Sequence, residues 1–298
     1  MSEAAALLSL SPDEEALSRT LCKIDELGLK DNLIELETSG FTTIKGVLSE
    51  DRIEHAKQAI LNRVEKDTGK RIDPDTATAD DFEGMNYVHY MLYDDEVFEE
   101  ILMEDKPLAI ITYLLGESCL LSSMGCHFKG QGEGGVIPLH SDSPGPTPHP
   151  PYSMVANVNY ALTHYSREAG ALALVPRSHK LARQPTLPEM GLSGEHCNQS
   201  AVSMDLSPGD AVVWHGSTWH GSFPRQVPGI RMNLAVYFAR HSVVTQERHK
   251  DVVPSEVLNR HANDERFKRL LAGNQAYGWQ HEGPDFQKMA KAPRGLYD

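Results

Sequence analysis

Apolar residues in the first third of the chain recur every three or four positions, which is the spacing of an amphipathic helix. The capping sequence Ser49-Glu50-Asp51 precedes one such pattern, whose apolar members are Ile53, Ala56, Ala59, Ile60 and Val64. Similar patterns predict helices over 12–27, up to Gly40 and, in two parts, over 95–116. The polar stretch 67–94 predicts a long irregular loop.

Beyond residue 117 the apolar residues form short runs of the strand type, separated by turn-rich segments. After a first short run at 41–44, such runs lie at 119–129, 136–142, 153–163, 171–175, 201–205, 210–215, 218–222 and 230–240. Eight short strands after a helical first third predict a mainly β fold, a β-sandwich or barrel of the jelly-roll kind with flanking helices. Because no internal repeat or linker is visible, we expect a single domain over 1–298. Its parts are a helical N-terminal part (1–117), a jelly-roll core (118–242) and a C-terminal helical tail (243–298).

Composition narrows the possible partners. The formal net charge of −14, without a dense Lys/Arg cluster, argues against nucleic acid. No apolar run reaches the roughly 18 residues that a membrane-spanning helix needs, so we expect no membrane association. The four cysteines are scattered and form no C-x-x-C pair, which is typical of a reducing compartment. No basic segment precedes the apolar patch near the N-terminus, so we expect no signal peptide and a cytoplasmic location. The oligomeric state stays open.

The most suggestive local sequence is His140-Ser141-Asp142. On an extended backbone, residues two apart point their side chains to the same side. An imidazole and a carboxylate that converge in this way supply two of three ligands for a divalent metal. A second histidine would complete the two-His, one-carboxylate triad that suits non-haem Fe(II). His-x-Asp alone is weak support, so the prediction depends on finding that histidine.

A second stretch offers two candidates. The turn Pro208-Gly209-Asp210 leads into an apolar strand, after which His215 and His220 lie on either side of a Gly-Ser-Thr turn. Two arginines follow, Arg225 and Arg231, and the second opens another apolar strand. A buried arginine needs an anion, and its planar fork matches a carboxylate. The pattern is what an enzyme that binds Fe(II) and a dicarboxylate co-substrate would need.

These spacings resemble those of Fe(II)/2-oxoglutarate-dependent oxygenases of the phytanoyl-CoA dioxygenase type. In that family a Gly-Asp turn is followed, ten residues after the Asp, by the distal iron-binding His. Gly-Ser comes next, and an Arg lies eleven residues beyond the His. Asp210, His220, Gly221-Ser222 and Arg231 match this register. The register favours His220 over His215 as the ligand.

Other segments support the resemblance, which covers about residues 33–273. The sequence from Glu168 to His179 resembles the family signature N-G-x-L-x-x-x-P-G-S-H. It departs from the signature at Glu168-Ala169, where Asn is usual, and at Arg177, where Gly is usual. Gly40-Phe41 and Gly46-Val47-Leu48-Ser49 resemble the family's N-terminal strand and helix start.

The resemblance implies a role for each candidate. Iron would be bound by His140, Asp142 and His220. The co-substrate 2-oxoglutarate would be held at its far carboxylate by Arg231, with a hydrogen bond from Ser222, and near its iron end by Asn159. Arg225 is the competing clamp for the carboxylate, and His127 and Lys129 on the preceding strand are candidate pocket-lining residues.

The resemblance implies that the jelly roll is a double-stranded β-helix of the cupin-like kind, with N-terminal and C-terminal helices. It also implies the reaction class. Oxygen and 2-oxoglutarate would be consumed, succinate and CO2 released, and a small-molecule metabolite oxidised, by hydroxylation in the simplest case. Because Asp142 keeps the carboxylate that halogenating relatives lack, halogenation is not expected. Variable loops at 68–95, 143–152 and 181–200 would carry the substrate specificity. Two alternatives stay open: a cupin-like metal protein with isomerase or hydrolase activity, which would not need Arg231, and a catalytically inactive binding protein.

Overall fold

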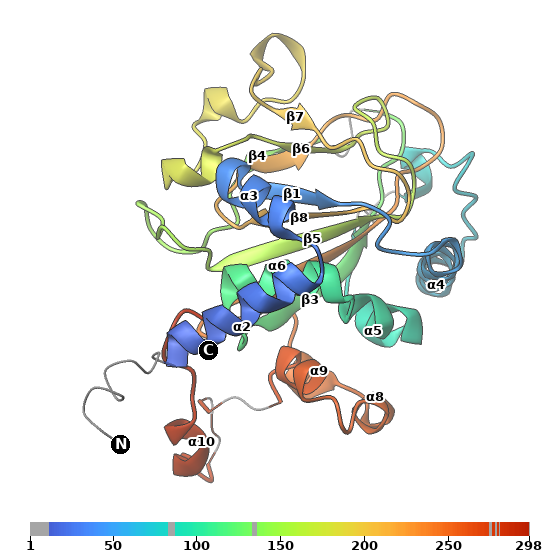
Figure 1. The fold of residues 1–298 in the computed structure, drawn as a ribbon. Helices are drawn as coiled ribbons and strands as arrows, with labels where there is room; N and C mark the ends of the chain where they lie inside the picture. The colour runs from blue at the N-terminus through green and yellow to red at the C-terminus, as the bar shows by residue number, and fades with distance from the viewer. Residues whose placement is uncertain are drawn as a thin grey trace.

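Two antiparallel sheets form the centre of the computed structural model, which describes residues 12–82, 87–132, 136–273, 276–277, 279 and 281–297 (Figure 1). The six-stranded sheet has the order β1-β8-β5-β10-β3-β2, and the four-stranded sheet has the order β4-β9-β6-β7. The strands are β1 (Phe41–Ile44), β2 (Tyr87–Val88), β3 (Leu120–His127), β4 (Ile137–His140), β5 (Val155–Ala161), β6 (Leu172–Leu174), β7 (Val202–Ser203), β8 (Ala211–His215), β9 (His220–Ser222) and β10 (Asn233–Ala239).

The predicted double-stranded β-helix with flanking helices is confirmed. Each of the eight runs predicted between 119 and 240 contains one observed strand, and the run at 41–44 coincides with β1. The observed strands are shorter than the runs because turns begin before the apolar pattern ends. One strand lies in the stretch that the sequence predicted as irregular: β2 pairs with β3, with Tyr87 opposite His127.

Helices cover the outer face of the large sheet (Figure 1). α6 contacts the middle strands β5, β8 and β10. Ser49 caps α4 by accepting a hydrogen bond from the N–H of Arg52, and Gly40 ends α3 in the left-handed conformation that glycine adopts without strain. The helices of this layer are α2 (Pro12–Glu26), α3 (Lys30–Ser39), α4 (Glu50–Thr68), α5 (Glu96–Leu102) and α6 (Asp105–Leu115).

The tail predicted as helical at 254–273 consists of shorter helices. Asp264 interrupts the pattern and caps the following helix by accepting from the N–H of Phe267. The tail helices are α7 (His249–Val252), α8 (Ser255–Arg260), α9 (Glu265–Leu270) and α10 (Phe286–Ala290). Short 3-10 helices lie at η1 (Ala79–Phe82), η2 (Met91–Tyr93), η3 (Ser178–Leu181), η4 (Leu187–Glu189) and η5 (Gly194–His196).

The two faces of the large sheet differ in polarity. Side chains alternate between the faces along each strand. On β5, Val158 packs in the core beneath the helices, whereas Asn157 and Asn159 alternate with it and point to the other side. Asn233 on β10 is also fully buried. Buried polar side chains are uncommon and need partners. The space between the two sheets is therefore where a polar site would lie.

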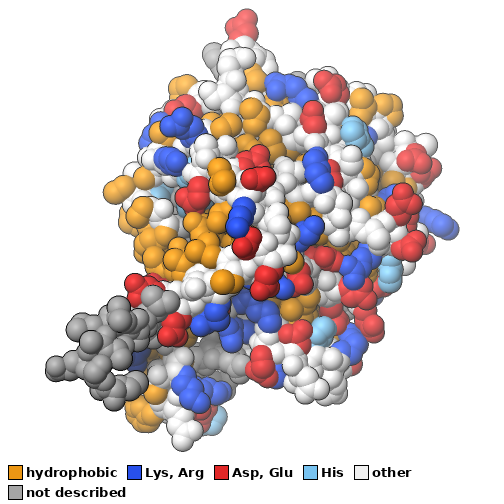
Figure 2. Space-filling model, viewed as in Figure 1, with side chains coloured by type: hydrophobic (Ala, Val, Ile, Leu, Met, Phe, Trp, Pro, Cys, Tyr) orange, Lys and Arg blue, Asp and Glu red, His pale blue; other side chains and the backbone are white. Residues whose placement is uncertain are grey.

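Acidic and basic side chains are interspersed on the face seen in Figure 2. Among the helices of the described ranges, none combines the length and the apolar character that a bilayer span requires.

Candidate metal centre

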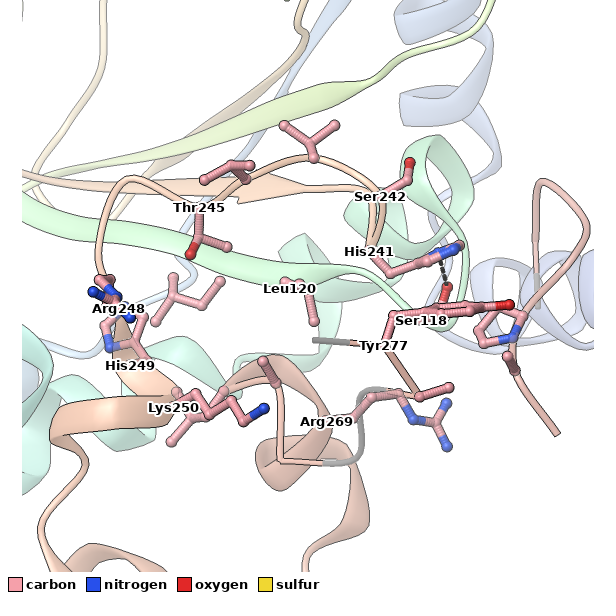
Figure 3. A pocket seen from close by; sticks show the side chains of 18 of the residues that line it. Ser118, Leu120, His241, Ser242, Thr245, Arg248, His249, Lys250, Arg269 and Tyr277 are labelled. Carbon is pink, nitrogen blue, oxygen red and sulfur yellow. Dashed lines mark hydrogen bonds between the residues drawn. The ribbon is translucent and has the colours of Figure 1, made fainter. Parts of the chain in front are cut away.

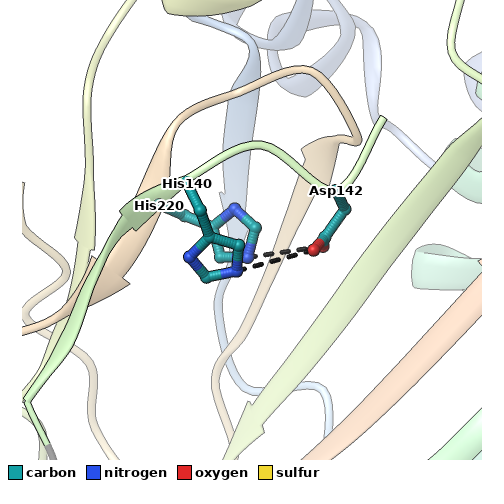
Figure 4. Close-up of side chains that lie close together, drawn as sticks. All are labelled: His140, Asp142 and His220. Carbon is teal, nitrogen blue, oxygen red and sulfur yellow. Dashed lines mark ion pairs between the residues drawn. The ribbon is translucent and has the colours of Figure 1, made fainter. Parts of the chain in front are cut away.

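Two imidazoles and a carboxylate converge beside the paired strands β4 and β9 of the small sheet (Figure 4). His140 ends β4 and His220 begins β9, and the two strands pair so that these residues are directly opposite each other. Asp142 follows β4 by two residues. Nε2 of His140 lies 3.5 Å from Oδ1 of Asp142, and Nε2 of His220 lies 3.3 Å from Oδ2. Each of the three residues offers one ligand atom, and these three atoms all lie within 4.8 Å of one another.

Backbone carbonyls orient both imidazoles for metal binding. Nδ1 of His140 lies 2.9 Å from the carbonyl oxygen of Pro138, and Nδ1 of His220 lies 3.1 Å from that of Thr218. A carbonyl oxygen only accepts, so each Nδ1 carries the proton and each Nε2 of a neutral ring keeps its lone pair. Burial lowers the pKa of His220, which favours the neutral form. Burial alone would lower the pKa of His140 too, but pairing with Asp142 raises it.

Asp142 is held in its ionised form. Burial opposes ionisation, but the neighbouring His220 and His140 and a hydrogen bond from Asn157 together lower the pKa of Asp142 to about 2. Nδ2 of Asn157 donates to Oδ2 of Asp142 at 2.8 Å. Sequence reasoning missed Asn157, although it lies two residues before the candidate Asn159 and so on the same face of the predicted strand.

Replacing Asn157 with alanine is expected to weaken metal binding by about 10–100-fold, the usual effect of losing a partner that orients a ligand. The carboxylate of Asp142 would lose the donor that fixes its rotamer. Isothermal titration of the apoprotein with Fe(II) without oxygen measures the change. Unchanged affinity in this variant would show that the Asn157 contact does not orient the ligand.

The competing histidine lies outside this cluster. His215 ends β8, and alternation along the strand places it with Val213, which packs in the core beneath the helices. Its Nδ1 accepts a hydrogen bond from the N–H of Ser217 at 3.0 Å. Burial, together with the charges of His179 and Arg240, lowers the pKa of His215 to about 3.

Two buried basic side chains, Arg231 and Lys129, lie beside each other, and no carboxylate among the described residues pairs with either of them. Arg231 is 3% exposed; one of its Nη atoms donates to the carbonyl oxygen of Gly170 at 2.7 Å, while its buried Nε has no acceptor. Lys129, also 3% exposed, pairs with Arg231 through backbone hydrogen bonds of 3.2 and 2.8 Å. Unpaired charges are costly to bury. This arrangement therefore fits an anionic ligand.

Lys129 reaches the small sheet across the space between the sheets. Its Nζ donates to Oγ of Ser222 and to the carbonyl oxygen of Phe223, both at 2.6 Å. A Cβ at Gly170 would lie 2.6 Å from Cδ of Lys129, so the glycine of the family signature leaves room for this side chain. Lys129 thus links Ser222 to Arg231.

Asn159 lies near Arg231 rather than near the metal ligands. Its Oδ1 accepts from the hydroxyl of Tyr165 at 3.4 Å, and the guanidinium of Arg231 lies over the same ring, 5.0 Å from its centroid. The contact to the metal-binding carboxylate comes from Asn157 instead. Burial, and then the charges of Arg231, Lys129 and His220, lower the pKa of His127 to about 4.

Arg225, the competing clamp, is occupied by the backbone. Its guanidinium donates to the carbonyl oxygens of Gly229 (2.8 Å), Ala169 (3.0 Å) and Pro228 (2.6 Å). These contacts close the turn after β9. Arg225 therefore has a structural role in this fold, in contrast with Arg231.

The Gly-Asp turn is structural rather than part of the metal centre. The carboxylate of Asp210 accepts from the N–H of Gly46 at 2.9 Å and from Nζ of Lys45 at 3.0 Å. Gly209 has a φ of +89°, and a Cβ there would lie 2.6 Å from the carbonyl oxygen of Leu48. The turn before β8 and the segment that leads into α4 thus fix each other.

The departure from the family signature at Arg177 is visible in the backbone. Arg177 has a φ of +67°, in the left-handed region that glycine adopts freely and other residues adopt at a cost. Its N–H donates to the carbonyl oxygen of Ser39 at 2.8 Å, at the end of α3. Glycine is therefore the residue that suits this position best.

A cavity of about 1060 Å³ lies apart from this centre (Figure 3). It is bounded by the start of β3, the segment 241–251 and tail residues that include Arg269 and Tyr277. Lys129 follows the other end of β3, which is roughly 20 Å away at about 3.3 Å per strand residue. The cavity is therefore not part of the metal centre.

Comparison with solved structures shows the same fold elsewhere. HygX from Streptomyces hygroscopicus, solved with nickel and 2-oxoglutarate bound, superposes with a TM-score of 0.57 at 20% identity, over 76% of this chain and 92% of that one. The non-haem α-ketoglutarate-dependent carbocyclase SnoK from nogalamycin biosynthesis gives a TM-score of 0.53 at 19% identity, over 78% of this chain and 90% of that one.

Sequence comparison supplies the family. Dioxygenase af480 of Aspergillus fumigatus is 27% identical over an alignment of 213 residues, and the match covers 69% of this chain and 64% of the relative's own length. The family model for phytanoyl-CoA dioxygenase (PhyH) matches residues 36–233, about two thirds of the chain. The match includes the three converging ligands and the buried pair Lys129 and Arg231, and the chain belongs to the phytanoyl-CoA dioxygenase (PhyH) family.

Proposed function

We propose that this oxygenase binds Fe(II) through His140, Asp142 and His220 and oxidises a small-molecule metabolite. Two imidazole nitrogens and one carboxylate oxygen are the donor set of the facial triad, which leaves coordination positions open for co-substrates. The protonated Nδ1 atoms and the ionised carboxylate give all three side chains the state that a metal requires.

We propose further that 2-oxoglutarate binds with its far carboxylate at Arg231 and Lys129, near Ser222. The observation that carries this proposal is the pair of buried basic side chains, neither of which has a carboxylate partner among the described residues. A dicarboxylate would supply the missing anion and an acceptor for Nε of Arg231. Asn159 would contribute at the end of the co-substrate that Arg231 binds, by accepting a hydrogen bond from Tyr165. A non-oxidative metal enzyme would have no need for this anion site.

The chain's residues would contribute positioning and charge. Iron, when bound, supplies the activation of oxygen that is coupled to decarboxylation of 2-oxoglutarate. Asn157 and the backbone carbonyls hold the ligands in one geometry, and Arg231 fixes one end of the co-substrate so that its other end can reach the metal. The apolar cluster of the small sheet, which includes Leu139, Trp219 and Phe223, would exclude water from one side.

We propose hydroxylation as the reaction. Substrate R–H, O2 and 2-oxoglutarate would give R–OH, succinate and CO2, with one oxygen atom in each oxidised product. A ring closure, as the name of SnoK states for that protein, would instead remove two hydrogens and release water. We also propose that residues 1–298 act as one domain, since one hydrophobic core includes residues of the helices, the large sheet and the tail.

Incubation with ¹⁸O2 tests the reaction type. Fe(II)-loaded protein, 2-oxoglutarate and a library of small metabolites are followed by mass spectrometry. Hydroxylation is expected to add one ¹⁸O atom to the consumed metabolite and one to succinate. A product that has lost two hydrogens without gaining oxygen would refute hydroxylation, while succinate formation alone would still support the oxygenase.

Binding of 2-oxoglutarate is expected to take up a proton through Lys129. Burial, and then the nearby Arg231, lower the pKa of Lys129 from 10.5 to about 6, so the free amine is mostly neutral at about pH 7.5. A carboxylate beside it favours the ammonium form and raises this pKa. The affinity for 2-oxoglutarate should therefore fall as the pH rises above 6, and it should stop falling once the pH exceeds the pKa of Lys129 in the complex.

Calorimetry in buffers of different ionisation enthalpy measures that uptake. We expect about one proton per 2-oxoglutarate for the wild type at about pH 7.5, and none attributable to this site in Lys129→Met. No uptake by the wild type would mean that Lys129 does not face the bound carboxylate.

A further inference from the structure

The insertion between β6 and β7 covers the exposed edge of the strand that carries His140. β4 is the last strand of the small sheet, so its outer N–H and C=O groups have no neighbouring strand. The N–H of Leu139 donates instead to the carbonyl oxygen of Met190 at 3.0 Å. The insertion thus supplies the hydrogen bonds that another strand would make.

Gln184 continues this pairing at Ser141, the residue between the two metal ligands His140 and Asp142. The N–H of Ser141 donates to Oε1 of Gln184 at 2.9 Å, and Nε2 of Gln184 donates to the carbonyl oxygen of Ser141 at 2.8 Å. A carboxamide presents a donor and an acceptor side by side, as a peptide group does. Ser141 lies between His140 and Asp142, so these two bonds hold the backbone from which both ligand side chains project.

The two residues before Gln184 contact the other parts of the centre. The carbonyl oxygen of Ala182 accepts from the N–H of His149 at 2.8 Å, in the Pro-rich loop that follows the carboxylate ligand. The carbonyl oxygen of Arg183 accepts from Nε1 of Trp219 at 2.8 Å, and its guanidinium lies 4.8 Å from the centroid of that ring. Trp219 directly precedes the second histidine ligand.

This segment is itself fixed within the insertion. The guanidinium of Arg183 donates to both carboxylate oxygens of Glu189, at 2.7 and 2.9 Å. Glu189 also accepts from the N–H and the hydroxyl of Thr186, at 2.8 and 2.7 Å. The position of residues 182–184 is therefore set by contacts that do not involve the metal ligands.

We propose that residues 182–184 position the metal ligands, and that Gln184 is the positioning residue through which the insertion controls the geometry of the metal centre. This inference rests on the proposed function, because it requires that His140, Asp142 and His220 bind a metal. Since 181–200 is also a loop in which we expect substrate specificity to lie, a substrate that displaces this segment would alter the metal centre at the same time.

Binding of Co(II) to the apoprotein tests the inference, since the visible spectrum of Co(II) reports the arrangement of its ligands. Gln184→Glu keeps the shape of the side chain but replaces the donor beside the Ser141 carbonyl oxygen with an acceptor. We expect the Co(II) affinity to fall about tenfold, at the lower end of the effect of outer partners. The spectrum at saturation should shift, and Gln184→Ala should show the same direction of change.

Gln199→Glu is the matched control. Gln199 is exposed on the same insertion, and its Nε2 donates to the carbonyl oxygen of Cys197 at 3.1 Å, a contact that does not involve the metal-binding segment. This variant should keep the wild-type affinity and spectrum. The melting temperatures of the three variants without metal (Gln184→Glu, Gln184→Ala and Gln199→Glu) should be close to that of the wild type. This result would separate a positioning role from loss of the fold.

The outcomes distinguish the two proposals. A wild type that binds Co(II) while Gln184→Glu has the same affinity and spectrum would overturn the inference and leave the proposed function standing. A wild type that binds no Co(II) would overturn the proposed function and the inference with it. A shifted spectrum in both Gln184→Glu and Gln184→Ala, with Gln199→Glu unchanged, supports the inference.

Discussion

Replacing His220 with alanine is expected to abolish metal-dependent turnover and to weaken Fe(II) binding by more than the roughly 10–100-fold that outer partners contribute. His220 supplies one of two imidazole nitrogens, and its ring is fixed by the carbonyl oxygen of Thr218. Without it, two ligands of the cluster found among the described residues remain, His140 and Asp142. Equilibrium dialysis against Fe(II) without oxygen measures the affinity, and succinate formation measures turnover.

His215→Ala is the informative comparison, because both histidines flank the same turn. His215 lies on the other side of its strand and contacts Ser217 rather than the metal cluster. This variant should keep its Fe(II) affinity, although removing a buried ring should lower its melting temperature. If His215→Ala lost Fe(II) while His220→Ala retained it, the assignment of the third ligand would have to be reversed.

Replacing Arg231 with alanine is expected to raise the KM for 2-oxoglutarate by about 10–100-fold, because a charge-assisted hydrogen bond is worth about 1.5–3 kcal/mol and 1.4 kcal/mol is a factor of ten. The guanidinium is buried and its Nε has no acceptor, so it has capacity for a carboxylate. Turnover at saturating 2-oxoglutarate should fall less than kcat/KM, since the lost contact is remote from the reacting end of the co-substrate. Initial rates at varied 2-oxoglutarate measure both quantities.

Arg225→Ala should show the opposite pattern. Its guanidinium donates to the carbonyl oxygens of Gly229, Ala169 and Pro228, so its loss should lower the melting temperature. The KM for 2-oxoglutarate should stay close to the wild-type value. A large rise in that KM with Arg225→Ala, together with none for Arg231→Ala, would place the carboxylate at the other arginine.

Much of this fold could be predicted because its patterns are local. The strand at 41–44 and the cap at Ser49 depend on neighbouring residues alone. The two-residue strand β2 could not be predicted, because Tyr87 and Val88 pair with residues of β3 that lie far from them in the sequence. The helical tail was interrupted where Asp264 favours a cap over helix continuation.

The site could be predicted only as far as family spacing and alternation reach. The residues alone left His215 and His220 as alternatives; what separates them is the pairing of β4 with β9, which no local pattern reveals. Asn157 was within reach, because alternation places it on the face of Asn159. Gln184 was not, since its contact with Ser141 joins an irregular insertion to a sheet edge 43 residues earlier.

The most direct test of the account is the dependence of succinate formation on Fe(II). Metal-free protein is supplied with 2-oxoglutarate and oxygen, with and without one equivalent of Fe(II), and succinate is measured over time beside Asp142→Ala. We expect succinate only with Fe(II), only in the wild type, and faster when a true substrate is present. Succinate formation by Asp142→Ala at the wild-type rate, or none by the Fe(II)-loaded wild type with any tested metabolite, would contradict the account.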